Sequence, residues 1–285
     1  MIYVSTGAFK TPDVASILDV CLERGIDRLE LSSGTHFVDG MLDPVRRHHG
    51  RPMKYLVHNY FPPHPTPFVL NLGAIDEPAR TRSMDHCCTA IDLAAEFGAP
   101  FYSVHAGSAM NARPEELGRP LAHRAHLEVD RAYAVFVENV RSLAEYAGRK
   151  GLGLLIENHV VAPFNLIDGQ NRFLFASTAE EMLRLVDDVR SAHLGLLLDV
   201  GHLNVTAASL GFDRGKCIEA VAPHIKAFHL SENDGTADQN LAVRLDSWFL
   251  GILREFRDTT AVIESYRLEP AEIHACMAAV ERALG

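Results

Sequence analysis

Short apolar runs alternate with longer amphipathic stretches along the whole chain. Each run is brief, nearly continuous in apolar residues and often β-branched, as expected of strands that are buried on both faces of a parallel sheet. The runs that we expect to form strands are Ile2–Thr6, Arg28–Leu31, Tyr55–His58, Phe101–His105, Leu152–Glu157, Leu194–Asp199, Ile225–Leu230 and Ala261–Glu264. The pattern therefore predicts eight parallel strands.

The stretches between these runs have helical periodicity. In Glu128–Gly148 the apolar residues recur at spacings of three and four, which places one apolar stripe on a helix. Thr11 before Pro12 predicts a helix start, and so does Ser177 three residues before Glu180. Glycines lie where three of the helices should end, at Gly25, Gly98 and Gly151.

The alternation of strands and helices continues over all 285 residues without a linker or a change of composition. We therefore predict a single α/β domain over residues 1–285, a closed (β/α)₈ TIM barrel. An open doubly wound sheet is the alternative, but no strand is followed by a GxGxxG turn. The proline-rich stretch Asn59–Ala79 is expected to be a long loop after the third strand, either a lid or a rigid surface loop.

Composition and charge narrow the classes of function. The net charge is −10 and no long run of Lys or Arg is present, which disfavours a nucleic-acid partner. The five cysteines show no CxxC spacing, and neither a signal peptide nor a membrane span is evident, so we expect reduced thiols in a cytoplasmic protein. The sequence leaves open whether copies of the chain form a homo-oligomer.

Six of the predicted strands end in His, Asp or Glu. These residues are His58, His105, Glu157, Asp199, His229 and Glu264, with His202 just beyond Asp199. Each alone has an ordinary explanation, but a closed barrel brings the carboxyl ends of all its strands to one rim. Carboxylates buried there need a cation or a buried partner to offset desolvation. The pattern thus predicts a metal site.

Other polar residues do not stand at the ends of predicted strands. Nine histidines in helices or loops are interpreted as surface residues: His36, His48, His49, His64, His86, His123, His126, His193 and His224. His159 has either a structural role or a substrate contact. Trp248 is expected to pack in the helix after strand seven. Arg244 and Arg267 are expected to form surface salt bridges rather than to reach a substrate phosphate or hydroxyl.

Four segments closely resemble the xylose-isomerase-like TIM-barrel superfamily. They are IEN at 156–158, LDVGH at 198–202, HLSENDG at 229–235 and IES at 263–265. The superfamily includes sugar isomerases and epimerases, inosose dehydratases and an apurinic endonuclease branch. The similarity covers the barrel from the third strand to the eighth.

The resemblance implies a ligand set. In the epimerase branch, residues matching Glu157, Asp199, His229 and Glu264 hold one divalent ion, and a His matching His202 contacts the substrate. In the endonuclease branch a three-metal cluster also uses residues that match His58, His105 and His202, and an Asp-x-His that aligns with 238–240. Asp238 is present here, but Asn240 replaces the histidine. That departure argues against the complete endonuclease cluster, whereas His58 and His105 leave room for a second metal.

The leading hypothesis is a metal-dependent isomerase or epimerase acting on a sugar, sugar phosphate or polyol. Two Glu, one Asp and one His are mainly oxygen donors, which suit Mn²⁺ best and also accept Mg²⁺, Co²⁺, Fe²⁺ or Zn²⁺. Glu157 and Glu264, on strands that two others separate in the barrel, would transfer a proton through a metal-stabilised enediolate. No other cofactor is expected. The alternatives are a phosphodiesterase of the endonuclease type, a dehydratase and a non-catalytic metal-binding barrel.

Overall fold

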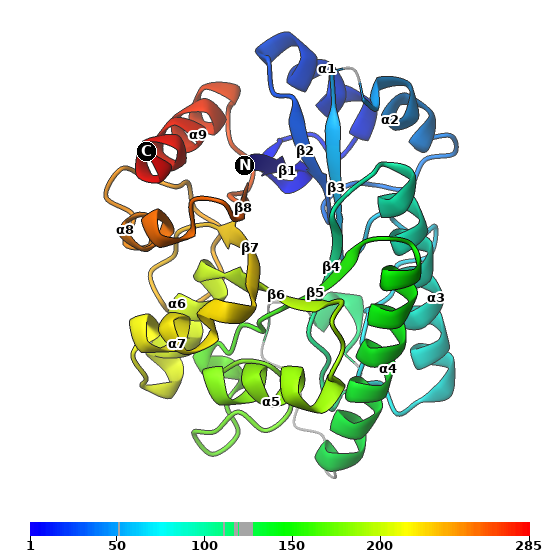
Figure 1. Cartoon of the computed structure of the whole chain (residues 1–285), viewed down its shortest axis with the longest axis vertical. Helices are drawn as coiled ribbons and strands as arrows, with labels where there is room; N and C mark the ends of the chain where they lie inside the picture. The colour runs from blue at the N-terminus through cyan, green and yellow to red at the C-terminus, as the bar shows by residue number, and fades with distance from the viewer. Residues whose placement is uncertain (51, 111, 117–118, 120–127) are drawn as a thin grey trace.

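The computed structural model describes residues 1–285 except 51, 111, 117–118 and 120–127. Eight parallel strands form a closed barrel in which each strand pairs with the next and β8 pairs with β1 (Figure 1). The strands are β1 Ile2–Ser5, β2 Arg28–Leu31, β3 Lys54–His58, β4 Phe101–His105, β5 Gly153–Glu157, β6 Leu194–Asp199, β7 Ile225–Leu230 and β8 Thr260–Ile263. The predicted (β/α)₈ barrel is confirmed, and each predicted strand end lies within one residue of the observed one.

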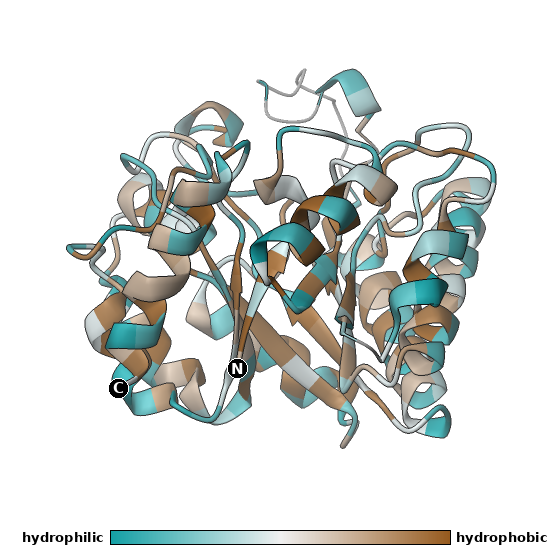
Figure 2. Cartoon of the chain, turned by 90° about the horizontal axis from the view of Figure 1, so that it is seen from above, coloured by the Kyte–Doolittle hydropathy of each residue, from teal (hydrophilic) through white to brown (hydrophobic). Residues whose placement is uncertain are grey.

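Helices surround the barrel. They are α1 Val14–Arg24, α2 Leu42–His48, α3 Glu77–Glu96, α4 Val129–Arg149, α5 Ala179–Val189, α6 Val200–Leu210, α7 Arg214–Val221, α8 Leu250–Leu253 and α9 Pro270–Leu284. Short 3₁₀ turns are Thr6–Ala8, Pro114–Glu116, Pro163–Asn165, Ala222–His224 and Arg254–Phe256. Figure 2 shows apolar strands at the centre and helices whose polar faces point outward. Among the described helices, none is both long and apolar enough to cross a membrane.

Two of the predicted helix starts are wrong by one or two residues. Asp13, rather than Thr11, caps α1, because its carboxylate accepts a hydrogen bond from the backbone N–H of Ser16 at 2.9 Å. Thr178, rather than Ser177, caps α5 and forms a capping box with Glu181. The predicted helix ends are confirmed: left-handed glycines follow α1, α3 and α4, namely Gly25, Gly98 and Gly151.

The loop after β3 is fixed to its neighbour. It runs over residues 59–76, so Ala79 belongs to α3 and not to the loop. The side-chain amide of Asn71 donates to the backbone oxygens of Ser108 and Met110 in the loop after β4. The hydroxyl of Tyr60 accepts a hydrogen bond from the backbone N–H of Leu70. These bonds favour a loop that is held in one conformation over a mobile lid.

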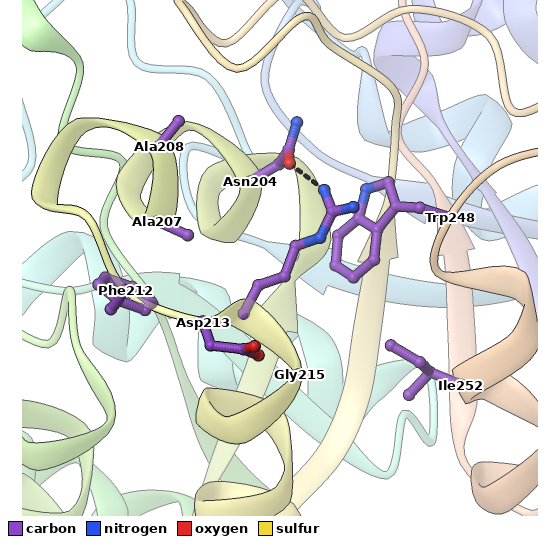
Figure 3. A pocket seen from close by; sticks show the side chains of 9 residues that line it. Asn204, Ala207, Ala208, Phe212, Asp213, Gly215, Trp248 and Ile252 are labelled. Atoms are coloured by element: carbon purple, nitrogen blue, oxygen red, sulfur yellow. Dashed lines mark hydrogen bonds between the residues drawn. The ribbon is translucent and has the colours of Figure 1, made fainter.

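Trp248 lies in the turn before α8 and not within a helix. The guanidinium carbon of Arg214 sits 3.8 Å from the centroid of the Trp248 ring. Figure 3 shows Trp248 and Asn204 in this region. Asn204 accepts a hydrogen bond from the same guanidinium. The tryptophan therefore joins α6 and α7 to the segment before α8, which is the packing role predicted from the sequence.

Candidate metal centre

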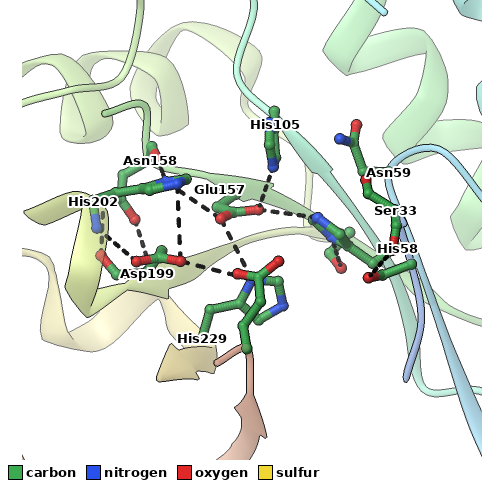
Figure 4. A network of polar contacts seen from close by, with 12 residues as sticks. Ser33, His58, Asn59, His105, Glu157, Asn158, Asp199, His202 and His229 are labelled. Atoms are coloured by element: carbon green, nitrogen blue, oxygen red, sulfur yellow. Dashed lines mark hydrogen bonds and ion pairs between the residues drawn. The ribbon is translucent and has the colours of Figure 1, made fainter. Parts of the chain in front are cut away.

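Four side chains at the carboxyl rim of the barrel meet in one place. Glu157 ends β5, Asp199 ends β6, His229 lies in β7 and Glu264 directly follows β8. Each offers one ligand atom, and these atoms all lie within 4.8 Å of one another. All four side chains are buried. The convergence expected from the strand-end pattern is thus present, and Figure 4 shows Glu157, Asp199 and His229 directed toward one another.

The atoms that face the centre lack ordinary partners. Glu157 Oε1 and Asp199 Oδ2 are buried and have no hydrogen-bond partner, and His229 Nδ1 faces carboxylates, 2.8 Å from Glu264 Oε2 and 3.4 Å from Glu157 Oε1. Buried polar atoms are normally satisfied, because leaving one unpaired costs desolvation energy. Three carboxylates and one imidazole with lone pairs aimed at a common point form a donor set that fits a divalent cation.

Electrostatic contacts within the group are strong. Burial alone would lower the pKa of His229, but Glu264, Glu30 and Glu157 outweigh it and hold that pKa well above its usual range. Burial would likewise raise the pKa of Glu264, yet the adjacent imidazole of His229, 2.8 Å away, lowers it to about 2. In the absence of an ion, a protonated His229 thus supplies part of the positive charge that these carboxylates require.

Glu30 belongs to the centre although it was not among the predicted site residues. It is fully buried in β2, and its Oε2 lies 3.1 Å from Nε2 of His229. In the neutral ring, which an ion would require, a proton on Nε2 donated to this carboxylate leaves Nδ1 with a lone pair directed at the common point. The available signal was a charged residue between Leu29 and Leu31 in a strand buried on both faces.

His58 and His105 lie on the other side of Glu157. Their Nε2 atoms are 3.3 and 3.2 Å from Glu157 Oε2. These three residues form a second group that could hold an ion, and Glu30, His58 and His229 form a third. The Nδ1 atom of His58 is hydrogen-bonded to the hydroxyl of Ser103 at 2.9 Å, and burial lowers the pKa of His58 to about 3. His58 is therefore a neutral imidazole, the form that binds metals.

His202 and Asp238 lie beside the group formed by Glu157, Asp199, His229 and Glu264. Nδ1 of His202 lies 2.8 Å from the backbone oxygen of Asn158, and Nε2 lies 3.4 Å from Asp238 Oδ2. The amide of Asn240 donates to the same Asp238 oxygen at 2.9 Å. In the described part of the chain, no third ligand joins His202 and Asp238 in a group that could hold an ion. These two residues adjoin the centre without completing a further metal position.

Comparison with known proteins identifies the family. A family model for the xylose isomerase-like TIM barrel matches residues 44–265, most of the chain. The chain belongs to the xylose isomerase-like TIM-barrel family. No match is found among curated protein sequences.

Solved structures share the fold of this xylose isomerase-like barrel over their whole length. A D-tagatose 3-epimerase-like protein is 20% identical with a TM-score of 0.72, covering 100% of this chain and 99% of its own. D-psicose 3-epimerase from Clostridium cellulolyticum, solved with D-tagatose, is 14% identical with a TM-score of 0.71 and 99% coverage of both chains. A Thermus thermophilus protein soaked with ZnCl₂ is 21% identical with a TM-score of 0.62, covering 99% of this chain and 98% of its own.

A cavity of about 480 Å³ opens beside the centre of this xylose isomerase-like barrel. His105, His202 and Asp238 line the end that adjoins the centre, and His159 lines it as well. Burial lowers the pKa of His159 to about 3, so this side chain faces the cavity as a neutral imidazole. That position agrees with the substrate-contact interpretation of His159.

The remaining predictions for polar residues have mixed outcomes. His86 is buried rather than on the surface, and its Nε2 donates to the backbone oxygen of Asn59 at 2.9 Å. Arg244 forms an exposed ion pair with Asp246, as predicted, whereas exposed Arg267 forms no ion pair with the described residues, contrary to the prediction. The other described histidines in that set are exposed or half-buried: His36, His48, His49, His64, His193 and His224. His123 and His126 lie outside the described residues.

Proposed function

We propose that this protein is a divalent-metal-dependent sugar isomerase or epimerase that works by proton transfer. The observation that carries the proposal is the convergence of four buried side chains next to a cavity, with carboxylate oxygens of Glu157 and Asp199 that have no hydrogen-bond partner. The set is rich in oxygen donors, so Mn²⁺ is the preferred ion. Structural neighbours described as sugar epimerases support the same class of reaction.

Glu157, Asp199, His229 and Glu264 would hold the ion. When bound, it would chelate adjacent carbonyl and hydroxyl oxygens of a sugar and stabilise the negative charge that develops as a carbon-bound proton leaves. Glu157 ends β5 and Glu264 directly follows β8, and β6 and β7 separate these two strands around the barrel. They can therefore approach the reacting carbon from different sides, one removing the proton and the other returning it.

His202 would position the substrate. Its Nδ1 is held by the backbone oxygen of Asn158, which directs Nε2 toward Asp238 and the cavity. The ring is buried and therefore oriented before substrate arrives. A hydrogen bond from Nε2 to a substrate oxygen would hold the carbon acid in line with the two glutamates.

Turnover in D₂O tests the mechanism. With Mn²⁺-loaded protein and an active sugar found by screening, we expect deuterium at the reacting carbon of the product and of recovered substrate, because a carboxylate base exchanges its proton with water. Glu157→Gln and Glu264→Gln should each abolish incorporation wherever metal analysis shows that the ion is retained. Product without any deuterium would instead indicate a direct hydride shift. Metal binding without turnover across the sugar and polyol panel would indicate a non-catalytic barrel.

A second candidate function is phosphodiester cleavage at damaged DNA. His58 and His105, both close to Glu157 Oε2, favour it because they offer a second metal position. Asn240 in place of an imidazole beside Asp238 opposes it. Incubation of Zn²⁺- or Mn²⁺-loaded protein with an abasic oligonucleotide distinguishes the two functions. We expect no cleavage, and rapid cleavage that His105→Ala abolishes would favour this second function.

A further inference from the structure

The cavity beside the metal centre changes character along its length. Near the centre it is lined by polar side chains, including His105, His202 and Asp238. The rest of its wall comes largely from the loops that follow β3, β4 and β5. There Ser108, Glu116, Arg119 and Asn165 are polar, but most of the side chains are apolar. These include Val69, Leu70, Met110, Ala162, Phe164 and Leu174.

The apolar part of the wall is packed from behind. Met110 and Leu174 belong to a buried cluster with Val161 and Phe173, separate from the barrel core. A backbone hydrogen bond from Ala109 to Phe173 holds the two loops together. The wall is therefore a preformed apolar surface, not a set of side chains that happen to be exposed.

Backbone carbonyl groups of this wall already accept hydrogen bonds from protein side chains. The carbonyl oxygen of Met110 accepts hydrogen bonds from Asn71 and Ser108, and that of Leu174 accepts one from Asn171. A sugar hydroxyl placed against these residues would exchange its water partners for few protein ones, which costs desolvation energy. A fully hydroxylated sugar chain is thus poorly matched to the surface that these apolar side chains form.

Two unpartnered side-chain oxygens mark where polar groups fit. Asn59 Oδ1 is buried without a hydrogen-bond partner, and Figure 4 shows Asn59 on the same side of Glu157 as His105. It can accept a sugar hydroxyl near the centre. Asn165 Oδ1, next to Phe164 in sequence, also has no partner, so the wall around Phe164 can accommodate one donor.

We propose that the natural substrate is a keto sugar or polyol derivative that carries an apolar aryl or alkyl substituent, which binds against Val69, Phe164 and Leu174. This inference rests on the proposed function, because the metal centre must hold the two reacting oxygens. The apolar wall and the residues beside the metal centre line one cavity. One molecule can therefore hold its reacting carbon at the centre and its apolar substituent against the wall. A cavity of about 480 Å³ has the size typical of sites for drug-sized ligands.

Hydroxamates with one chelating headgroup and different tails test the inference. Their affinities for Mn²⁺-loaded protein are measured by calorimetry with acetohydroxamate, phenylacetohydroxamate and the hydroxylated four-carbon erythronohydroxamate. We expect phenylacetohydroxamate to bind about tenfold more tightly than acetohydroxamate, which corresponds to about 1.4 kcal/mol. Erythronohydroxamate should gain nothing over acetohydroxamate, because its hydroxyls lose water against the apolar wall.

Substitutions test whether the apolar wall causes the gain in affinity of the phenyl tail. Phe164→Asn, at a side chain exposed enough to leave folding intact, and Leu174→Asn should remove the gain of the phenyl tail without weakening acetohydroxamate. Phe37→Asn, at an exposed phenylalanine that does not line the cavity, is the matched control and should keep the gain.

The outcomes separate the two proposals. If erythronohydroxamate binds as tightly as phenylacetohydroxamate or more so, or if Phe164→Asn and Leu174→Asn leave the gain intact, the apolar-substituent inference is wrong while the metal chemistry stands. If acetohydroxamate shows no Mn²⁺-dependent binding, the proposed function fails and the inference fails with it.

Discussion

The Nε2 atom of His229 lies 3.1 Å from Oε2 of Glu30, a residue 199 positions earlier in the chain. Both side chains are fully buried. The contact joins β7 to β2 inside the barrel and makes Nε2 the nitrogen that keeps its proton when the ring of His229 is neutral. The opposite nitrogen, Nδ1, is the one that faces Glu157 and Glu264.

This contact predicts that Glu30 sets the affinity for metal without binding the ion. Glu30→Ala should weaken Mn²⁺ binding by about 10- to 100-fold, because the ring of His229 loses its orientation and part of its basicity. Glu30→Gln is the matched control and should weaken it less, since the amide oxygen still accepts the Nε2 proton. Calorimetric titration with Mn²⁺ measures both variants. Equal loss in the two would mean that the charge of Glu30, and not its hydrogen bond, matters.

Metal binding should stabilise the fold. At a free Mn²⁺ concentration about 100 times the dissociation constant, the free energy of unfolding should rise by about 2.7 kcal/mol, and EDTA should reverse the rise. Asp199→Asn should remove the response without destabilising the metal-free protein, because it deletes one of several buried carboxylates that repel one another.

Urea unfolding with and without Mn²⁺ checks this prediction, with metal analysis giving the expected one ion per chain. Asp246→Asn, which alters an exposed carboxylate paired with Arg244, is the control and should respond like the unchanged protein. A full Mn²⁺ response in Asp199→Asn would remove Asp199 from the ligand set.

The loop after β3 should affect substrate binding through Tyr60, which lines the cavity. Tyr60→Phe removes the acceptor for the backbone N–H of Leu70, a bond worth about 1 kcal/mol. We expect the Michaelis constant for a sugar substrate to rise about fivefold, with the turnover number nearly unchanged. Tyr146→Phe, which removes an exposed hydroxyl on α4, is the matched control. An unchanged Michaelis constant would assign the loop a purely structural role.

The sequence was sufficient for the barrel and for most of the metal centre, for a physical reason. Strands buried on both faces must be apolar, so the few polar residues at their ends were conspicuous, and closure of the barrel brought them together. Glu30 was missed because it lies inside a strand, and its partner His229 is distant in sequence. His86 was assigned to the surface because nothing in the periodicity of α3 indicates that the backbone at Asn59 meets it. Both errors concern partners that only the tertiary fold supplies.

The buried histidine on α3 should make stability depend on pH. Burial lowers the pKa of His86 below its ordinary value of 6.5, and the neighbouring His64 and Arg82 lower it further, whereas the hydrogen bond to Asn59 opposes the shift. The unfolded chain therefore binds a proton near pH 6.5 that the folded protein takes up only at lower pH. The stability from neutral His86 is fully present above about pH 6.5 and decreases as the pH falls from there toward the folded pKa.

Replacing His86 by Gln should flatten this dependence, because the amide can still donate to Asn59 but does not titrate. The unfolding free energy of the unchanged protein minus that of His86→Gln should fall between pH 7 and pH 5, by at most about 1.4 kcal/mol per pH unit. Urea unfolding at closely spaced pH values measures the difference, and His36→Gln, at an exposed histidine, is the matched control. A difference that stays constant or grows on acidification would mean that His86 is protonated in the folded state, and that its hydrogen bond to Asn59 outweighs its burial.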